Sequence, residues 1–181
     1  LQPQRACRRL RPGDRPQPRP LSNTRKPFTA DEDLGMEDVM VRPVIEHDAE
    51  GIARLDQLLT KVWRVEHWEE RIAFAMRRDP EGSLVGEKEG RIVAYLFSDV
   101  RGSEYGFADK TGWLEALGVD PDLQKSSLGR RLLDQVMQRF QSTGVNLVRT
   151  LVSDQHAQMG TFLEKMGFTQ EPIRVLSRAT G

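Results

Sequence analysis

The chain has 181 residues, enough for one compact domain and a tail, and its 27 Lys and Arg residues balance its 27 Asp and Glu residues. Its single cysteine, Cys7, excludes an intrachain disulfide, and no apolar run approaches the roughly 18–20 residues that span a bilayer. Nothing in the sequence requires an oxidising compartment or a membrane, so we expect a cytoplasmic protein.

The charge is unevenly distributed along the chain. Residues 1–30 hold eight basic residues against one acid, which leaves 19 basic and 26 acidic residues in the remainder. Six prolines between residues 3 and 27 would interrupt any helix or strand. We therefore expect residues 1–35 to form a disordered basic tail and residues 36–181 to form a single domain.

Three interpretations of this tail stay open. It is an extension that precedes a natural start at Met36, a basic arm for nucleic acid or an acidic partner, or a solvated linker. No aromatic residues are interleaved with its arginines, which argues against nucleic-acid binding.

The first half of the folded part alternates between strand and helix patterns. We expect a strand over Val39–Pro43, a helix capped by Asp48 with apolar positions from Ile52 to Val62, a helix over Trp68–Arg77, and strands over Ser83–Glu87 and Arg91–Asp99. The last two strands are joined by a hairpin at Lys88-Glu89-Gly90, and the second is apolar enough to be buried on both faces.

The second half continues the alternation. We expect a strand over Gly112–Val119, a helix over Ser126–Gln141, a strand over Asn146–Val152, a helix over His156–Met166, and final strand pieces at Phe168–Thr169 and Ile173–Ser177. The helix over Ser126–Gln141 has the clearest apolar stripe. Alternating strands and helices, together with the hairpin, indicate an α/β fold with a mixed sheet.

The most informative segment runs from Leu117 to Leu133, where a strand ends, a short loop follows and the longest helix begins. The start of this helix is rich in small residues, which let an anion approach the backbone: Ser126, Ser127 and Gly129. The N–H groups and the partial positive charge of a helix N-terminus suit a pyrophosphate, and Lys125, Arg130 and Arg131 add charge. The alternative is an ordinary strand–turn–helix with a serine cap.

Two motifs here resemble one known family. Gln124-Lys-Ser-Ser-Leu-Gly129 resembles the acyl-CoA pyrophosphate loop, Q/R-x-x-G-x-G/A, of GCN5-related N-acetyltransferases (GNAT), and Phe162-Leu-Glu-Lys-Met-Gly-Phe168 resembles their late F-[YF]-x-K-x-G-F signature. Together with the opening Val41-Arg-Pro, the resemblance covers about Met40–Ser177. It implies a mostly antiparallel central sheet flanked by helices in a single domain.

The resemblance also implies that acetyl-CoA is the co-substrate. The residues that it places at the cofactor are Leu117, Gly118, Val119, Gln124, Lys125, Ser126, Ser127, Leu128, Gly129, Arg130 and His156. A backbone N–H within Leu117–Val119 would donate to the thioester oxygen, where negative charge develops.

The sequence departs from the family pattern at three places. Ser127 stands where the first motif glycine is usual, and His156 stands near a frequent asparagine. Leu163 occupies the place of a tyrosine that is the proposed general acid, which leaves that role open, with Tyr105 as a candidate.

The implied reaction moves an acetyl group to a primary amine by direct attack in a ternary complex, since no cysteine lies in the folded part to form an acyl-enzyme. The acceptor is a protein N-terminus, a lysine or a small amine, and the acidic balance of residues 31–181 favours a cationic one. A homodimer stays open, and we expect no metal site because the histidines show no ligand spacing. The alternative is a non-catalytic CoA-binding module with the same fold.

Glu115 is the candidate general base. Counting by two along its strand, it shares a face with Leu117 and Val119, and burial in this apolar strand would favour its protonated form. The alternative is a structural Glu115 that points into a wet groove or pairs with Lys110 or an arginine.

Overall fold

The computed structural model describes residues 38–102, 110–124 and 126–180. Three of the sequence predictions therefore lie outside the described residues: the disordered tail over residues 1–35, Tyr105 as an acid, and Lys125 at the cofactor.

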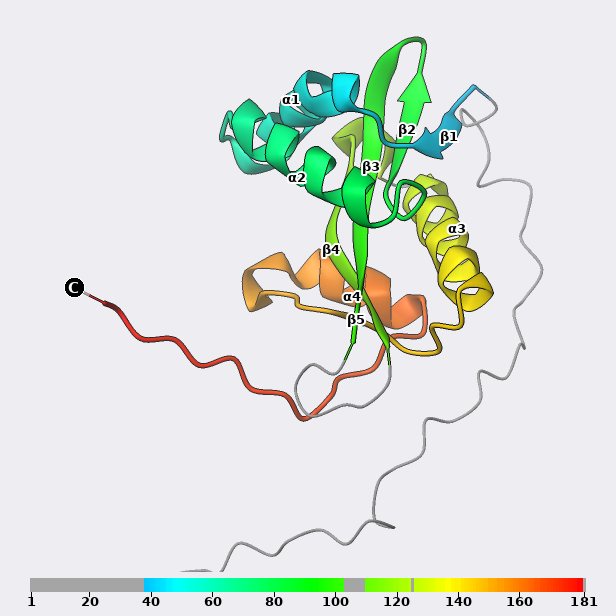
Figure 1. The fold of residues 1–181 in the computed structure, drawn as a ribbon. Coiled ribbons are helices and arrows are strands. Elements are labelled where there is room, and N and C mark those ends of the chain that lie inside the picture. Colours follow the sequence, from blue (N-terminus) through cyan, green and yellow to red (C-terminus); the bar gives the residue numbers. More distant parts are fainter. Residues whose placement is uncertain (1–37, 103–109, 125, 181) are drawn as a thin grey trace, which may run out of the picture.

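The strands and helices follow the predicted order. They are β1 (Met40–Pro43), α1 (Ala49–Thr60), α2 (Val65–Arg78), β2 (Leu84–Lys88), β3 (Arg91–Arg101), β4 (Thr111–Val119), α3 (Leu128–Ser142), β5 (Val148–Thr150) and α4 (Ala157–Lys165) (Figure 1). The sheet has the order β1-β2-β3-β4-β5, with antiparallel pairing throughout except for the parallel pair β4–β5. The expected mixed, mostly antiparallel sheet flanked by helices is confirmed.

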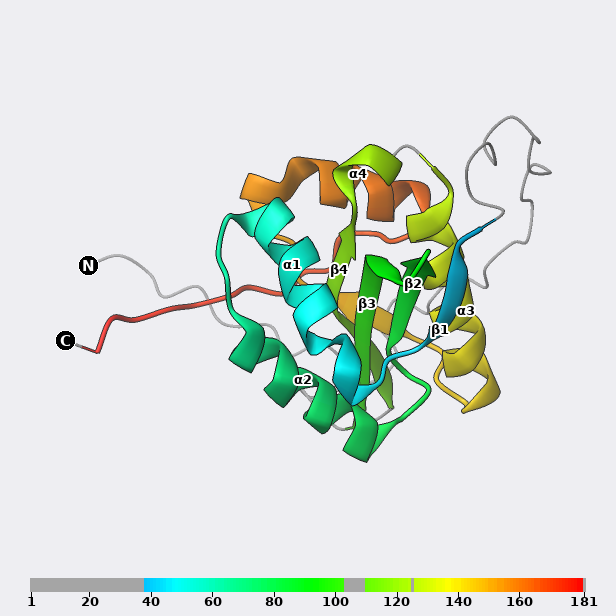
Figure 2. The ribbon, with the colours of Figure 1, turned by 90° about the horizontal axis from the view of Figure 1, so that it is seen from above.

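Helices cover both faces of this sheet. From above, α1 and α2 lie on one side of the strands and α3 on the other (Figure 2). Each side has its own apolar cluster: one joins α1 and α2 to Val85, Tyr95 and Phe97, and the other joins α3 and α4 to residues such as Leu96 and Leu114. Strand β3 contributes to both clusters and is buried from Ile92 to Asp99, as its continuous apolar run predicts.

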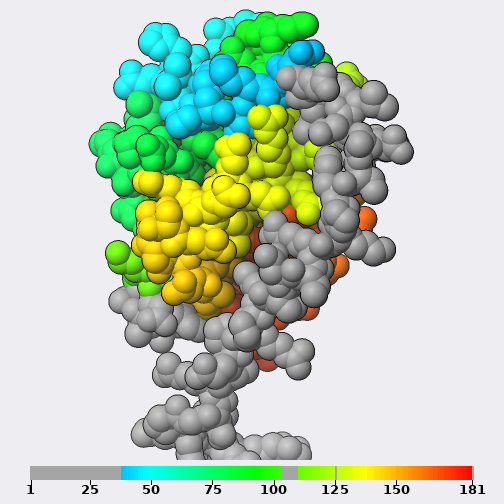
Figure 3. Space-filling view, turned by 90° about the vertical axis from the view of Figure 1, so that its right-hand side faces the viewer, coloured from blue at the N-terminus to red at the C-terminus, as the bar shows by residue number. Residues whose placement is uncertain are grey.

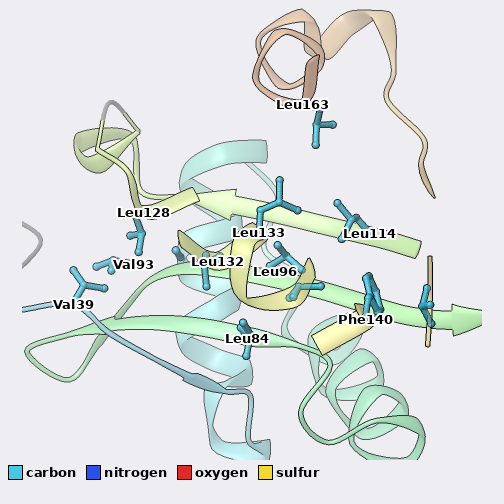
Figure 4. Packing of buried hydrophobic residues seen from close by; sticks show 13 residues of the cluster. Val39, Leu84, Val93, Leu96, Leu114, Leu128, Leu132, Leu133, Phe140 and Leu163 are labelled. Atoms are coloured by element: carbon cyan, nitrogen blue, oxygen red, sulfur yellow. The ribbon is translucent and has the colours of Figure 1, made fainter. Parts of the chain in front are cut away.

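The long helix α3 is held by the predicted stripe. Leu128, Leu132, Leu133, Val136 and Phe140 are all buried in one cluster with sheet residues and Leu163 of α4. The close view shows Leu128, Leu132, Leu133 and Phe140 among these side chains (Figure 4). The opposite side of α3 forms part of the molecular surface (Figure 3). The spacing of this stripe settles which side of α3 faces the sheet.

The turn between β2 and β3 has the expected hairpin chemistry. Glu89 and Gly90 both adopt positive φ, 51° and 75°. Two such residues in a two-residue loop make a type I′ turn, whose twist matches that of the flanking strands.

Helix α1 is shorter than its apolar pattern predicts. It ends at Thr60, so Val62 lies beyond it and is 53% exposed. Leu58 lies within the helix but is also largely exposed, at 51%. Asp48 stands at the N-cap position, yet its carboxylate binds elsewhere: it accepts from the Ile45 N–H at 2.9 Å and pairs with Arg42 at 2.7 Å.

The predicted strand pieces at Phe168–Thr169 and Ile173–Ser177 are wrong, because neither segment pairs with the sheet. Glu171 is tied to Arg149 of β5 by an ion pair of 2.7 Å, and Pro172, which has no N–H to donate, follows directly. The chain then runs away from the sheet in extended form (Figure 1), with Leu176 89% exposed. No helix in the described ranges has the length and apolar character that crossing a membrane would need.

Candidate active site

Strands β4 and β5 run together for only a short distance. The paired residues of β4 are Gly112, Trp113 and Leu114, opposite Val148 to Thr150. From Glu115 to Val119, β4 remains paired with β3, but among the described residues no strand pairs with it on the β5 side. The main chain of the segment that the sequence places at the thioester is therefore open on one edge.

A β-bulge lies where this opening begins. Phe97 of β3 faces Ala116, whereas the next residue, Ser98, faces Leu114, so Glu115 is the extra residue. The bulge shifts the alternation of side chains by one position.

This shift corrects the predicted orientation of Glu115. Leu117 and Val119 pack against the cluster on the α3 side, whereas the Glu115 carboxylate binds Arg71 of α2 on the opposite face. The prediction that the three side chains share a face is therefore wrong, because counting by two holds only in an uninterrupted strand.

The predicted pyrophosphate loop connects β4 to α3 through a single 3-10 turn, Pro121–Leu123. Asp120 starts this turn, accepting from the Asp122 N–H at 3.0 Å. At the end of the loop, Ser126 Oγ accepts from the Leu128 N–H at 3.3 Å. The Arg131 N–H donates to the Ser127 carbonyl at 2.8 Å, and the N–H groups of Gly129 and Arg130 belong to the first turn of α3.

The two glycines at this site, Gly118 and Gly129, are needed for different reasons. A methyl group at Gly118 would lie 2.5 Å from Cζ of Tyr95, so packing requires a glycine there. A methyl group at Gly129 would lie 3.5 Å from Val119 Cγ2 and 3.6 Å from the Phe162 ring, which are ordinary contacts. Protein packing therefore does not demand a glycine at 129, whereas a ligand that approaches the backbone would. The residues present fit a diphosphate.

The charged side chains around the loop differ in their availability. Among the described residues, Arg130 pairs with Asp134, one turn later on α3, at 3.6 Å. Arg131 is committed elsewhere, because its Nη1 donates to the Val39 carbonyl at 3.0 Å. Arg130 is thus the better placed of the two for an anion.

His156 stands at the N-cap of α4, the helix that follows β5 in the chain. Its side chain makes no capping hydrogen bond to α4. The turn before α4 is capped instead by Ser153, whose side chain accepts from the Gln155 N–H at 3.3 Å. His156 is exposed, and its contact with a cofactor stays a prediction.

A pocket of about 490 Å³ lies on the α2 side of the sheet. One face of α2 lines it, from His67 to Arg77, together with Phe97, Ser98 and Asp99 of β3 and with Glu115 of β4. Since Glu115 is also the residue at which β4 leaves β5, the pocket meets the opening in the sheet. We name it the acceptor pocket.

The two carboxylates on the sheet side of the acceptor pocket are both ion-paired. Glu115 binds Arg71 at 2.9 Å and also binds Arg101. Asp99 binds Arg101 at 3.2 Å and Arg78 at 2.7 Å. Glu115 thus pairs with two arginines, as its structural alternative predicts.

A buried polar cluster supports the same wall, and sequence reasoning missed it. Asp56 of α1 is 1% exposed and accepts from Arg64 at 2.6 Å, from Trp68 Nε1 at 3.2 Å and from the Tyr95 hydroxyl at 3.3 Å. Burial, with the charge of Asp56 beside it, raises the pKa of Tyr95. The signal was present, since Asp56 lies four residues after Ile52 on the buried side of an amphipathic helix.

His67 is the second residue that the sequence did not assign to the site. It lies on the face of α2 that lines the acceptor pocket, with its ring edge-on to Trp68 at 5.3 Å between centroids. Partial burial, followed by the positive charges of Arg64 and Arg71, lowers the pKa of this imidazole.

No group of three or more His, Cys, Asp or Glu side chains that could hold a metal ion occurs in the ranges that the structure covers. The sequence-based expectation of no metal site stays a prediction.

Solved structures of low sequence identity share the fold. The aminoglycoside N-acetyltransferase AAC(6')-Iy in complex with CoA superposes with a TM-score of 0.67 at 14% identity, covering 79% of this chain and 95% of that one. Glucosamine-6-phosphate N-acetyltransferase from Arabidopsis thaliana gives a TM-score of 0.63 at 22% identity, covering 80% and 100%.

Curated relatives match parts of the sequence. Mycothiol acetyltransferase from Thermobispora bispora is 27% identical over 100 residues, 55% of this chain and 34% of that protein. The [ribosomal protein bS18]-alanine N-acetyltransferase of Salmonella typhimurium is 25% identical over 122 residues, 64% of this chain and 78% of that protein. The chain spans 34–40% of the length of the first three mycothiol acetyltransferases it matches. A sequence model of the acetyltransferase (GNAT) family matches residues 49–168, and this chain therefore belongs to that family.

Proposed function

We propose that this chain transfers an acetyl group from acetyl-CoA to a primary amine by direct attack in a ternary complex. The observation that carries the proposal is the meeting of two sites at Glu115. The opening of β4 and the N-terminus of α3 lie on one side, and the acceptor pocket lies on the other.

The cofactor side uses main-chain groups. The N–H groups of Gly129 and Arg130 at the start of α3 bind the diphosphate, and Gly129 leaves it room to approach. Gln124, Ser126 and Ser127 border this loop, and His156 lies at the start of α4. Bound acetyl-CoA supplies a thioester whose carbonyl carbon is open to an amine. A main-chain N–H within Leu117–Val119 donates to the oxygen of that carbonyl.

The acceptor side takes an amine in its neutral form. A volume of about 490 Å³ suits a small amine, or the end of a lysine or of a protein N-terminus. An α-amine loses its proton near pH 8, whereas a lysine amine has a pKa of about 10.4 and needs more help. One relative is named for mycothiol and another for an alanine of a ribosomal protein, so both small and protein acceptors belong in the test.

A non-catalytic CoA-binding module is the second candidate. The observation that favours it is Leu163, which stands in the place of the family's tyrosine acid and is only 5% exposed. No proton donor replaces it at that position of α4, so a module would bind the cofactor and release no thiol.

The test combines calorimetry with a thiol-release assay. We expect heat of association with CoA and acetyl-CoA, and thiol release with at least one member of a panel of peptide N-termini, lysine peptides and small amines. Binding without thiol release on any acceptor would favour the module. Absence of binding would refute the cofactor site and both candidates with it.

A further inference from the structure

The acceptor pocket contains a titratable side chain that the reaction described so far does not use. His67 lies one turn before Arg71 on the same face of α2, and Arg71 reaches Glu115 across the pocket. His67 is exposed at the pocket wall, and its ring lies edge-on to Trp68, a side chain only 2% exposed. No residue within the described ranges makes a hydrogen bond to its ring nitrogens.

The carboxylates of the sheet wall are poorly suited to take a proton. Glu115 and Asp99 each have two guanidinium partners, and protonation of either would break a pair of charge-assisted hydrogen bonds. Glu70 also lines the pocket, as an exposed carboxylate.

The charges that surround His67 favour its neutral form. Partial burial and the guanidinium groups of Arg64 and Arg71 oppose protonation, and Asp56 and Glu70 offset them only in part. Because Asp56 is already bound by Arg64, Trp68 and Tyr95, it offers little to an imidazolium. The imidazole therefore keeps a free lone pair at neutral pH, which is the state that a proton acceptor needs.

We propose, building on the acetyl transfer proposed above, that His67 is the catalytic base that accepts the proton of the acceptor amine, and that Glu115 is a positioning residue. The amine nitrogen forms a bond to the thioester carbonyl carbon, and the carbon–sulfur bond breaks. One proton of the nitrogen passes to the His67 imidazole, directly or through one water molecule, and then to solvent. The thiolate that leaves takes up a proton from solvent. Glu115 holds Arg71 beside the pocket.

The experiment compares three variants with the wild type: His67→Gln, Glu115→Gln, and His47→Gln as a control at an exposed histidine outside the pocket. The pH–rate profile of kcat/KM for the amine is measured from pH 5 to 10, with acetyl-CoA affinity by calorimetry. In His67→Gln we expect a loss of about 10²- to 10⁴-fold near neutral pH, unchanged cofactor affinity, and recovery at high pH, where the amine loses its own proton. In Glu115→Gln and His47→Gln, kcat/KM should fall on the acid side of the pH–rate profile (the acid limb) as it does in the wild type.

A second measurement does not depend on turnover. The ring signals of the three histidines are assigned by their Gln variants and titrated by NMR. The His67 signal should titrate below pH 6.5 and shift when the acceptor amine is added, and the His47 signal should not respond to the amine.

The outcomes separate this inference from the proposed function. If the wild type releases thiol and the pH–rate profile of His67→Gln is unaltered, the role of His67 is refuted while the proposed transfer stands. Loss of the acid limb in Glu115→Gln has the same consequence. A His67 signal that ignores the amine also refutes it. No thiol release by the wild type with any acceptor refutes the proposed transfer and this inference together.

Discussion

Gly129 gives the sharpest test of the cofactor site, because protein packing and ligand binding make different demands on it. A methyl group there meets its nearest neighbour at 3.5 Å, so Gly129→Ala should leave the free energy of unfolding within about 1 kcal/mol of the wild type, with better helix propensity in its favour. The same methyl group stands between a diphosphate and the N–H groups of the first turn of α3. Loss of one hydrogen bond to a charged group costs about 1.5–3 kcal/mol, which is roughly a 10- to 150-fold weaker Kd.

Gly129→Glu adds a negative charge to the same obstruction. Two like charges about 4 Å apart repel by about 4 kcal/mol at an effective dielectric constant of about 20, which is close to a 10³-fold loss of affinity before any steric cost. Calorimetry with CoA measures the affinity, and thermal unfolding checks that each variant is folded.

The matched control is Gly160→Ala on α4, where the added methyl group meets Val152 only at 4.0 Å. It should match the wild type in cofactor affinity. If Gly129→Glu retained micromolar affinity for CoA while remaining folded, the N-terminus of α3 would not be the diphosphate site.

Two further predictions concern the wall between the sites. Gly118→Ala places a methyl group 2.5 Å from the Tyr95 ring and should lower stability by about 1–3 kcal/mol and Tm by about 2–10 °C, measured by calorimetric unfolding; an unchanged Tm would contradict the close approach. Burial by itself would raise the pKa of Asp56, but hydrogen bonds from Arg64, Trp68 and Tyr95 outweigh it, so its pKa in the folded state is lowered. Its contribution to stability is therefore complete above about pH 4 and is lost as the pH falls through the lower folded-state pKa. Asp56→Asn should be less stable at pH 7 and lose less stability on acidification, and equal acid slopes in urea unfolding would speak against this linkage.

The errors of the sequence reasoning have a common physical cause. The segment Ile173–Ser177 has strand-like composition, but a strand exists only where a neighbour accepts its hydrogen bonds, and β5 provides just three paired residues. The orientation of Glu115 was wrong for a related reason, since the bulge that moves it depends on how β4 pairs with β3.

The amino-acid sequence by itself determined the elements whose signal is local: the buried run of β3, the apolar stripe of α3, and the small residues where a strand gives way to a helix. Only the tertiary structure decided which of these elements meet. The Tyr95 hydroxyl donates to Asp56 while its ring packs on Gly118, and arginines from α2 and β3 form ion pairs with Glu115. His67 lines the same pocket as Glu115. Periodicity reports on which side of an element is buried, because that depends on residues a few positions apart. Which charged groups meet depends on contacts between residues as many as 60 positions apart, and these exist only once the sheet and its helices have packed.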